Sequence, residues 1–435
     1  MGHLVIYKGE ELADSFLTNR IASMVTTIRE NGIQPDDVVI CRANTPLGVY
    51  LHWVVCCKLN LLPVFVPSDF SLESIYTFDA SINFKAVLDL KENDLYVYFN
   101  PGKYYALLKN IEQGSVIHLT SATTGNPKFV LRTKKQINEE LRRYIAHLKI
   151  NESDVIFPTV PLDHSFGFIS GMLLSIMVGA KLVLPDMLLP RNIVKLSNEC
   201  RATFMLGAPY FYKKMLMVSP KYNLNDELRY IIASGGPMIE GLQNEFRKRF
   251  NKKLIQQYGS TETGSLCIDF DCVDYNCVGK PIPGVKLKTI EDEFSRKCVY
   301  VDSPATIGGY VNDNSVQCLG NGLYMMGDLG EVRADGSLVL LGRNDDILIV
   351  NGKKLDKHTV TSIIKQINGI LEANVFLEKH NDIEELICKY VGNKLFSKEV
   401  FVNHCKKVLA DYQIPKKFIK VDYLSSGKVT WKSEC

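Results

Sequence analysis

Short apolar runs recur along residues 115–257 and limit the possible folds more than any other feature of the sequence. Six of them have the length and residue types of buried strands: Ser115–Leu119, Asp154–Val160, Lys181–Leu184, Thr203–Gly207, Tyr230–Ser234 and Lys253–Gln257. Segments with helical periodicity separate several of these runs. Because strands that alternate with helices pack into mostly parallel sheets with helices on their faces, the pattern predicts an α/β fold.

Two of the separating segments repeat apolar residues with the period of an α-helix. The first lies over residues 137–148, and Thr133 with Gln136 predicts a capping box at its start. The second lies over residues 239–250. The stretch from Phe166 to Ala180 is also apolar, but it is shorter than a membrane span and therefore predicts a buried helix.

The sequence changes character past Arg343. Apolar residues with helical spacing predict a helix over residues 360–370, which is followed by two strands, Val375–Leu377 and Leu386–Val391, and by a second helix from about Ser397 to Tyr412. This segment has its own apolar faces and an α+β order. We therefore expect a large N-terminal domain over residues 1–342 and a small C-terminal domain over residues 343–435.

The charge balance and the cysteines exclude several classes of protein. Fifty-one Lys and Arg against 48 Asp and Glu leave a net charge of +3, so we expect no nucleic-acid partner. Twelve cysteines are scattered without a C-x-x-C pair, and the spacing of Cys267, Cys272 and Cys277 matches no zinc pattern, so reduced core thiols are expected. The sequence shows no signal peptide and no membrane span, and we expect a cytoplasmic protein.

A polar loop follows the first of the six predicted strands. Residues 120–128 read Thr-Ser-Ala-Thr-Thr-Gly-Asn-Pro-Lys, and hydroxyls and backbone N–H groups at a strand end can hold phosphate oxygens while a lysine neutralises their charge. A polar turn between two strands explains the composition equally well. The spacing is not that of a Walker A loop, which argues against an ordinary phosphoryl-transfer NTPase.

The run from Thr120 to Lys128 resembles the phosphate-binding loop of the adenylate-forming superfamily, which includes acyl- and aryl-CoA synthetases, nonribosomal-peptide adenylation domains and luciferases. Further motifs that resemble those of this family follow in the family's order: Pro161–Gly167, Ser234–Pro237, Tyr258–Gly264, Gly279–Pro281, Tyr324–Gly330, Gly342–Asp346 and Ser426–Lys428. Within this family, the motifs are most similar to those of acyl- and aryl-CoA ligases. The resemblance implies a large body of mostly parallel sheets covered by helices, plus a small mobile α+β C-terminal domain.

The reaction that the resemblance implies has two halves. A carboxylic acid attacks the α-phosphorus of ATP, with Mg²⁺ as cofactor, to give an acyl-adenylate and pyrophosphate. The thiol of coenzyme A then displaces AMP. As an alternative, the thiol belongs to the phosphopantetheine of a separate carrier protein, so that the chain is a stand-alone adenylation enzyme.

The resemblance assigns most of the motif residues to the nucleotide. The β- and γ-phosphates would be held by Thr120, Ser121, Thr123, Thr124, Gly125 and Lys128. The adenine would lie among Tyr258, Gly259, Gly235, Gly236 and Pro237. Thr261 would bind the α-phosphate, Glu262 would bind Mg²⁺, and Asp328 with Arg343 would bind the ribose.

Three further residues would serve the change between the two half-reactions. Lys428 would reach the carboxylate and the α-phosphate during adenylation. Asp345 stands at the family's hinge between the domains, and Gly352 matches the glycine beside the pantetheine path after rotation. The general physical support for the hinge is that hinges lie at the ends of secondary-structure elements.

His164 matches the residue that gates the substrate and thiol routes in acyl- and aryl-CoA ligases, although a lone histidine is more often structural. Its neighbour Asp163 leaves a choice of substrate open. If the Asp163 carboxylate points into the acyl pocket, it could pair with the ammonium group of an amino acid. If it points outward, a simple carboxylic acid is favoured.

A different class of function is a nucleotide-binding module with impaired catalysis. Ala122 stands where the family usually has glycine, and an added methyl group matters where the backbone needs positive φ or lies against a phosphate. The presence of Lys128, Thr261, Glu262 and Lys428 argues for an active enzyme.

Overall fold

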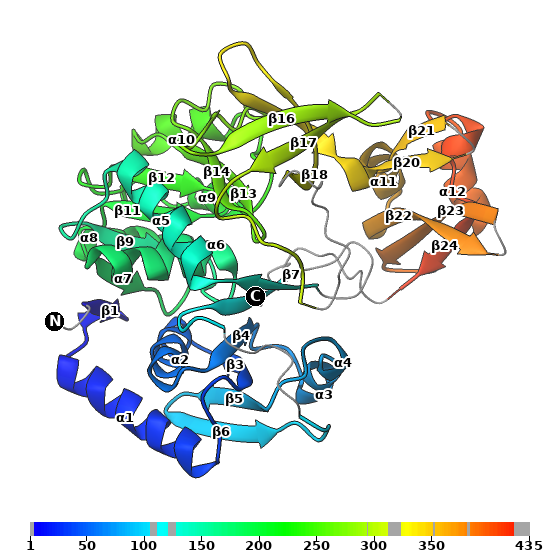
Figure 1. The fold of residues 1–435 in the computed structure, drawn as a ribbon. Helices are drawn as coiled ribbons and strands as arrows, with labels where there is room; N and C mark the ends of the chain where they lie inside the picture. Colours follow the sequence, from blue (N-terminus) through cyan, green and yellow to red (C-terminus); the bar gives the residue numbers. More distant parts are fainter. Residues whose placement is uncertain are drawn as a thin grey trace. The chain divides into compact units, whose positions relative to one another are not determined.

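The structure is a computed structural model that describes residues 4–104, 111–120, 128–293, 295–311, 323–350, 353–380 and 383–421. The chain divides into two compact units (Figure 1). The first comprises Met1–Thr120, Pro127–Met326 and Gly330–Leu340, and the second comprises Ser121–Asn126, Gly327–Leu329 and Leu341–Cys435.

The larger sheet of the first unit contains most of the predicted strands. Its nine strands are, in spatial order, β15 (Lys280–Pro281), β14 (Gly264–Asp269), β13 (Ile255–Ser260), β12 (Tyr230–Ala233), β11 (Phe204–Gly207), β9 (Val155–Pro158), β10 (Lys181–Leu184), β1 (Val5–Tyr7) and β2 (Glu10–Glu11). Neighbouring strands from β13 to β1 are parallel, and the pairs at the two edges are antiparallel. Strands β9 to β13 confirm five of the six predicted strands.

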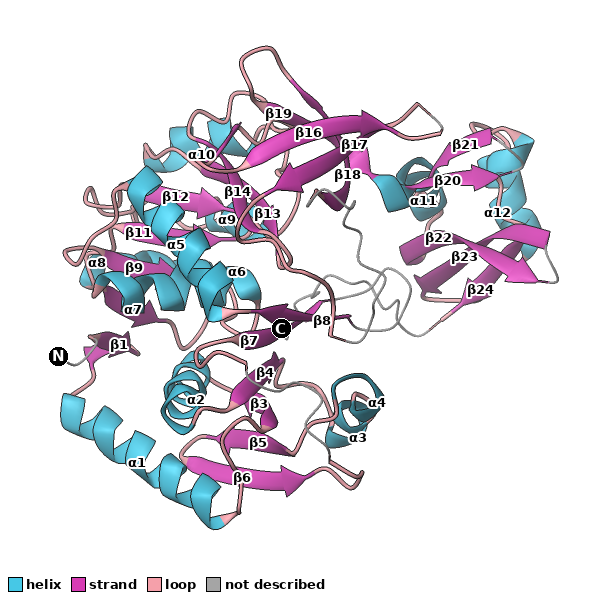
Figure 2. Ribbon diagram, viewed as in Figure 1, coloured by secondary structure: helices cyan, strands magenta, loops and turns pink. Residues whose placement is uncertain are grey.

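Helices cover both faces of this sheet, as Figure 2 shows by colour. The helices concerned are α5 (Lys134–Leu148) on one face and α8 (Pro190–Glu199), α9 (Pro209–Met215) and α10 (Leu242–Phe250) on the other. In β11, Phe204 and Leu206 pack in the core with α5, whereas Met205 packs with α8 to α10. A strand that is buried on both faces reads as a continuous apolar run, which explains why the sequence predicted these strands.

The second sheet of this unit has six strands. They are, in spatial order, β6 (Asp94–Phe99), β5 (Ala86–Lys91), β3 (Val38–Ala43), β4 (Leu62–Val66), β7 (Val116–Thr120) and β8 (Lys128–Arg132). The four inner strands are parallel and the two edge pairs are antiparallel. Helices α1 (Asp14–Glu30) and α2 (Pro46–Leu59) pack in one core with this sheet, and the short helices α3 (Leu72–Tyr76) and α4 (Asp79–Ile82) contribute to the other.

The apolar stretch after residue 165 is helical, as predicted. It consists of α6 (Ser165–Gly167), the π-helical turn η1 (Phe168–Leu173) and α7 (Leu174–Val178). Phe168 is fully buried and its ring lies 5.1 Å from that of Trp53 and 4.9 Å from that of Phe65. These ring contacts join the helical stretch to the six-stranded sheet. No helix in the described ranges is both long and apolar enough to cross a membrane.

Two helix predictions in this unit differ in their outcome. The capping box at Thr133 is confirmed, because its side chain accepts from the backbone of Gln136 and the Gln136 side chain accepts in return. The prediction of a helix from residue 239 is wrong at its start, since α10 begins at Leu242. Gly241 precedes it with a φ of 77°, and this left-handed backbone excludes earlier residues from the helix.

A third, antiparallel sheet was not predicted. Its strands are, in spatial order, β16 (Lys286–Glu291), β17 (Lys297–Asp302), β18 (Tyr324–Val332) and β19 (Leu338–Arg343). In β16 the exposed residues alternate with half-buried ones, so the strand presents no continuous apolar run. The fold class is confirmed as α/β, with this antiparallel sheet as an addition.

The second unit has an α+β order, as predicted. Its elements are η2 (Asn344–Asp346), β20 (Ile347–Val350), β21 (Lys353–Asp356), α11 (Lys357–Lys365), β22 (Ile370–His380), β23 (Ile383–Gly392), α12 (Lys398–Cys405), η3 (Asp411–Gln413) and β24 (Lys417–Lys420). Strands β22 and β23 confirm the two predicted strands and extend them. One core contains residues of α11, β22, β23 and α12.

Both helix predictions in this unit are too long. Helix α11 ends at Lys365, and Ile370 already begins β22, because Gly369 turns the backbone with a φ of 98°. Ile367 lies outside the helix but is buried, with an exposed fraction of 8 %. Its apolar side chain therefore indicates burial and not helical structure. Helix α12 ends at Cys405, and the chain reaches Tyr412 through turns and η3.

Candidate active site

The hairpin of β13 and β14 carries the motif at residues 258–264. The register shifts between Tyr258 and Gly259, and a Cβ on Gly259 would lie 2.1 Å from the carbonyl oxygen of Gly264. Gly264 itself has a φ of 70°. Both glycines are therefore required by the backbone of the turn, before any contact with a ligand is considered.

Side chains and backbone groups close this turn. Ser260 N–H donates to Thr263 Oγ1 at 3.3 Å, and Thr263 N–H donates to the Ser260 carbonyl oxygen at 3.3 Å. The two remaining residues of the turn, Thr261 and Glu262, are half-buried. The turn thus presents one hydroxyl and one carboxylate next to each other.

Thr261 is held from two sides. Its hydroxyl lies 3.0 Å from that of Ser165, which begins α6. Its carbonyl oxygen accepts a hydrogen bond of 2.8 Å from Arg132 Nη1 at the end of β8. The structure therefore brings the motif at residues 161–167 and the motif at residues 258–264 together.

A buried ion pair behind the turn was missed by the sequence analysis. Arg132 Nη2 lies 2.7 Å from Glu140 Oε2, and the side chains are 0 % and 3 % exposed. Glu140 Oε1 accepts from the backbone N–H of Ser265 at 3.0 Å and from its hydroxyl at 3.1 Å. The pair thereby links β8 and α5 to both ends of the turn.

Two tyrosines near Glu262 were also missed as site residues. The Tyr310 hydroxyl donates to Glu262 Oε1 at 3.1 Å and lies 3.0 Å from the Tyr324 hydroxyl. Lys128 Nζ lies over the Tyr310 ring, 4.6 Å from its centroid. The expected phosphate-binding lysine and the expected metal ligand thus contact the same tyrosine.

The donor set at the turn fits Mg²⁺. Glu262 offers a half-buried carboxylate, and a hard carboxylate oxygen suits this hard ion. Among the described residues, no group of three or more His, Cys, Asp or Glu is arranged to hold a metal ion. A Mg²⁺ ion at Glu262 would therefore take further ligands from phosphate oxygens and water, as is usual for this metal.

The ends of the expected phosphate loop are fixed by the antiparallel pair β7–β8. Thr120 and Lys128 are partners in the register, and Thr120 Oγ1 lies 3.4 Å from the Lys128 carbonyl oxygen. Ser121, Thr123, Thr124 and Gly125 lie between them and outside the described residues.

The expected adenine loop follows β12. Gly235 has a φ of 79°, and a Cβ on Gly235 or Gly236 would meet no atom within 4 Å. Pro237 follows them directly. Tyr258 is 8 % exposed, so most of its ring belongs to the core. The two glycines thus border open space, into which a flat base could approach the backbone closely.

Asp328 and Arg343 form an ion pair within the second unit. Arg343 Nη1 lies 3.1 Å from Asp328 Oδ1, and the side chains are 47 % and 12 % exposed. Gly327 has a φ of 73°, and a Cβ there would lie 3.2 Å from Arg343 Nη2. The glycine therefore allows the guanidinium to approach the backbone beside Asp328.

His164 and Asp163 precede α6. His164 is half-buried and occupies the N-cap position without a capping hydrogen bond from its side chain. Burial raises the pKa of the Asp163 carboxyl above its ordinary value, and the neighbouring His164 opposes this shift. Burial also lowers the pKa of His118 to about 3, an effect that the charges of Arg132 and His164 reinforce.

Residues 109–311 match the family model of the AMP-binding enzymes. The chain contains an AMP-binding domain. This match includes the turn at Thr261 and Glu262, both residues of the Lys128–Tyr310 contact, and the adenine loop. The resemblance inferred from the motifs is thereby confirmed.

Curated relatives of this chain are named for several related reactions. It is 28 % identical over 348 residues to the medium-chain fatty-acid–CoA ligase of Escherichia coli K12, which covers 74 % of this chain and 61 % of that protein. It is 25 % identical over 325 residues to the 3,4-dihydroxybenzoate–[aryl-carrier protein] ligase of Bacillus anthracis, covering 74 % and 73 %. It is 26 % identical over 479 residues to bacitracin synthase 3 of Bacillus licheniformis, covering 99 % and 7 %. The chain thus spans less than two thirds of the first and third of these relatives.

Solved structures agree with the fold. The O-succinylbenzoate coenzyme A synthetase of Bacillus subtilis in complex with ATP and magnesium superposes with a TM-score of 0.74 at 20 % identity, covering 97 % of this chain and 94 % of that one. ATP-bound MatB from Rhodopseudomonas palustris gives 0.71 at 18 %, covering 97 % and 92 %. At this identity the likeness establishes the fold alone.

Three expected residues concern the second unit. Asp345 lies in η2, directly after β19. Gly352 and Lys428 lie outside the described residues. The roles of all three stay predictions.

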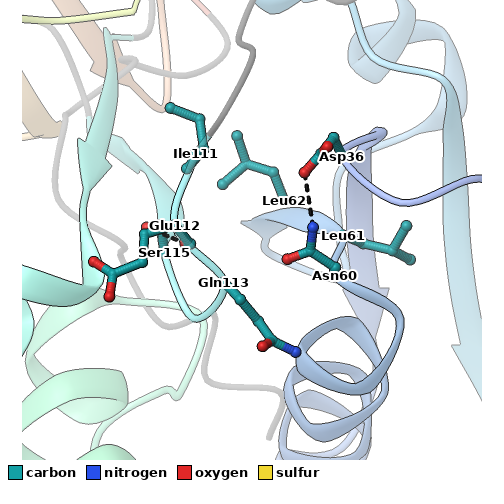
Figure 3. Close-up of a pocket in the computed structure, with 8 residues that line it drawn as sticks. All are labelled: Asp36, Asn60, Leu61, Leu62, Ile111, Glu112, Gln113 and Ser115. Atoms are coloured by element: carbon teal, nitrogen blue, oxygen red, sulfur yellow. Dashed lines mark hydrogen bonds between the residues drawn. The ribbon is translucent and has the colours of Figure 1, made fainter.

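A small pocket lies elsewhere in the first unit and contains no motif residue (Figure 3). It is lined by Asp36, Asn60, Leu61, Leu62, Ile111, Glu112, Gln113 and Ser115. Asp36 accepts a hydrogen bond of 2.8 Å from Asn60, and Glu112 adds a second carboxylate. Two acidic side chains make this pocket unsuitable for a nucleotide phosphate.

Proposed function

We propose that the chain is an ATP-dependent acid–thiol ligase, which adenylates a carboxylic acid and transfers the acyl group to coenzyme A. The observation that carries the proposal is the turn at Thr261 and Glu262, which is held by Ser165, Arg132 and Tyr310 beside Lys128. A hydroxyl, a carboxylate and an ammonium group in one place suit a metal-bound triphosphate.

In the first half-reaction a carboxylate oxygen of the acid attacks the α-phosphorus of ATP. The bond from this phosphorus to the bridging oxygen breaks, and pyrophosphate leaves with the electron pair. Thr261 would donate a hydrogen bond to the α-phosphate, and Lys128 with Thr120 would neutralise and hold the departing phosphates. Mg²⁺ bound at Glu262 would supply neutralisation of the phosphate charge.

The adenosine would be held by residues that combine open space with polar groups. The Gly235–Pro237 loop borders space for the base, with Tyr258 and Gly259 nearby in the motif sequence. Asp328, oriented by Arg343, offers carboxylate oxygens for the two ribose hydroxyls. Because Tyr258 is mostly buried, only a small part of this residue is available to the base.

In the second half-reaction the sulfur of a thiolate attacks the acyl carbon and AMP leaves with its phosphate oxygen. We assign Lys428 to the first half-reaction, Gly352 to the pantetheine path, His164 to the gate, and Asp345 to a hinge between domains over residues 1–342 and 343–435. Gly342 supports a hinge here, because it is exposed, has a φ of 135° and has no atom within 4 Å of a Cβ position.

The alternative acceptor is the phosphopantetheine thiol of a separate carrier protein. The relatives support both acceptors, since one is named a CoA ligase and another an aryl-carrier protein ligase. An amino acid stays open as the substrate, because the Asp163 carboxylate could pair with its ammonium group. We place the reaction in the cytoplasm, since the ten described cysteines are free.

Acid-dependent exchange of pyrophosphate into ATP tests the first half-reaction. A panel of fatty, aromatic and amino acids is assayed with Mg²⁺, and the active acid is then offered coenzyme A or a carrier protein. Thioester formation on free coenzyme A supports the ligase, whereas loading of a carrier protein alone supports the alternative. ATP binding without exchange for any acid would reject both in favour of a nucleotide-binding module.

A variant separates the two half-reactions. Lys428→Ala should abolish adenylation and leave thioester formation from a supplied acyl-adenylate largely intact. Equal loss of both steps would contradict the assignment of Lys428 to the first half-reaction.

A further inference from the structure

Tyr310 contacts two groups of opposite charge that the proposed function assigns to the same ligand. Its hydroxyl donates to Glu262 Oε1 at 3.1 Å, and the ammonium group of Lys128 lies 4.6 Å from its ring centroid. The carboxylate is therefore bound at the edge of the phenol and the cation at its face, which are the positions that suit each charge.

The backbone fixes the position of Tyr310 relative to both groups. Tyr310 forms a β-bridge with Val130, two residues after Lys128, and Val311 N–H donates to the Phe129 carbonyl oxygen at 2.9 Å. Ile307 N–H donates to the carbonyl oxygen of Glu262 at 2.9 Å. The segment that carries Tyr310 is thus hydrogen-bonded to the lysine strand and to the carboxylate turn.

The packing also restricts the ring. Tyr310 is 9 % exposed and shares a small core with Val130 and Ile307. Its hydroxyl lies 3.0 Å from that of Tyr324, which is 4 % exposed. A buried, hydrogen-bonded tyrosine keeps one orientation, so its contacts to Lys128 and Glu262 are maintained together.

Lys128 and Glu262 attract each other, and a direct ion pair would occupy both groups before any ligand arrives. An ammonium group in such a pair neutralises less phosphate charge, and a carboxylate in such a pair is a poorer metal ligand. The phenol ring gives each group a separate partner that a ligand can readily replace or share.

We propose that Tyr310 is a positioning residue, which orients Glu262 for a divalent cation and holds Lys128 for the triphosphate while preventing their direct pairing. The identity of the two ligands rests on the proposed function. The geometric relationship among the three residues does not depend on which acid is activated.

The test measures binding of Mg²⁺ and ATP by equilibrium titration, with and without the other ligand, before any activity is measured. Tyr310→Phe removes the hydroxyl and keeps the ring. It should raise the Mg²⁺ concentration for half-saturation of the ATP-bound protein about tenfold, because a hydrogen bond to a charged group is lost. Binding of ATP without Mg²⁺ should change less than twofold, because the lysine contact remains.

Tyr310→Leu removes the ring as well. In addition to the effect on Mg²⁺ binding, it should weaken metal-free ATP binding about threefold to tenfold, because Lys128 loses its cation–π partner and can pair with Glu262. In the double variant Tyr310→Leu with Glu262→Gln, metal-free ATP binding should recover, since the competing carboxylate charge is gone. Recovery of this kind is not expected if Tyr310 only fills space.

Tyr300→Phe is the matched control. Tyr300 is a half-buried tyrosine on β17 whose hydroxyl lies 3.4 Å from Met325 Sδ, so its substitution removes a phenol hydroxyl without touching Lys128 or Glu262. Its Mg²⁺ and ATP titrations should match those of the unsubstituted protein. Circular dichroism checks folding, and Tyr310→Phe decides the question if Tyr310→Leu does not fold.

The outcomes separate this inference from the proposed function. Unchanged Mg²⁺ and ATP titrations in both Tyr310 variants would overturn the positioning role, even if the unsubstituted protein activates an acid. Shifted titrations would support it, even if no acid in the panel supports pyrophosphate exchange.

Discussion

The guanidinium of Arg132 lies 2.7 Å from Glu140 Oε2, and both side chains are buried. The same guanidinium donates to the Thr261 carbonyl oxygen at 2.8 Å, and the same carboxylate accepts from Ser265. One ion pair between β8 and α5 therefore contacts both ends of the proposed catalytic turn.

Removing one partner of this pair should be strongly destabilising. Arg132→Met leaves the Glu140 carboxylate buried without its cation, and the free energy of unfolding should fall by about 3–5 kcal/mol. The double variant Arg132→Met with Glu140→Leu should lose less than the sum of the single variants, because no unpaired charge remains. Urea unfolding curves of the four proteins measure this coupling, and strict additivity would contradict it.

Gly264→Ala should disturb the same network from the opposite side. Gly264 has a φ of 70°, and a Cβ there would lie 2.2 Å from Glu140 Oε2. The matched control is Gly336→Ala, because Gly336 has a φ of 85° but no atom within 4 Å of its Cβ position. Backbone strain is thus common to both variants, and the loss of stability in Gly264→Ala should be larger by about 1–3 kcal/mol. Equal losses of stability in the two variants would show that Glu140 moves away from the added methyl group at no cost in free energy.

Much of the fold could be predicted because burial and backbone conformation coincide in it. Strands such as β11 are buried on both faces, and the apolar run itself marks their extent. The two properties separate after α11, where Ile367 and Ile370 stay buried while Gly369 turns the chain into β22. Apolar spacing reports only burial there, so the helix was predicted too long. In β16 the exposed side chains alternate with half-buried ones, and no apolar run marks the strand.

The candidate site was predictable only where its residues belong to recognisable motifs. Thr261, Glu262 and Lys128 were assigned to the candidate site in this way. Arg132 is 129 residues from Thr261 in sequence, and its role depends on a hydrogen bond to a carbonyl oxygen that every residue possesses. Tyr310 likewise depends on the return of the chain past Val130. Such contacts follow from the tertiary fold and leave no local pattern in the sequence.

Two buried histidines should make stability fall in mild acid. Burial lowers the pKa of His52 to about 4, which Asp89 opposes weakly, and lowers that of His118 to about 3. Since the unfolded pKa is about 6.5, the unfolded chain binds more protons below that pH. Their contribution to stability is complete above pH 6.5 and is lost as pH falls toward 4 and 3, at up to about 1.4 kcal/mol per pH unit for each histidine.

Unfolding curves between pH 7 and 4.5 measure this slope. His52→Leu and His118→Phe should each flatten it, and the double variant should flatten it most. Val55→Ala on the same helix as His52 is the control, because Val55 is fully buried and its truncation lowers stability without removing a titrating group. A slope that is unchanged in the double variant would assign the acid sensitivity to other residues.

Asp328→Asn should weaken recognition of the ribose of ATP. Arg343 Nη1 donates to Asp328 Oδ1 at 3.1 Å, and the proposed function assigns this carboxylate to the ribose hydroxyls. A carboxylate that accepts from a hydroxyl is a stronger partner than a neutral amide, so the variant should raise the KM for ATP about tenfold. It should hardly change the KM for 2′,3′-dideoxy-ATP, which has no hydroxyls to lose. The preference for ATP over the dideoxy analogue would then largely disappear in pyrophosphate exchange, whereas equal weakening of both nucleotides would assign Asp328 to positioning Arg343 and not to the ribose.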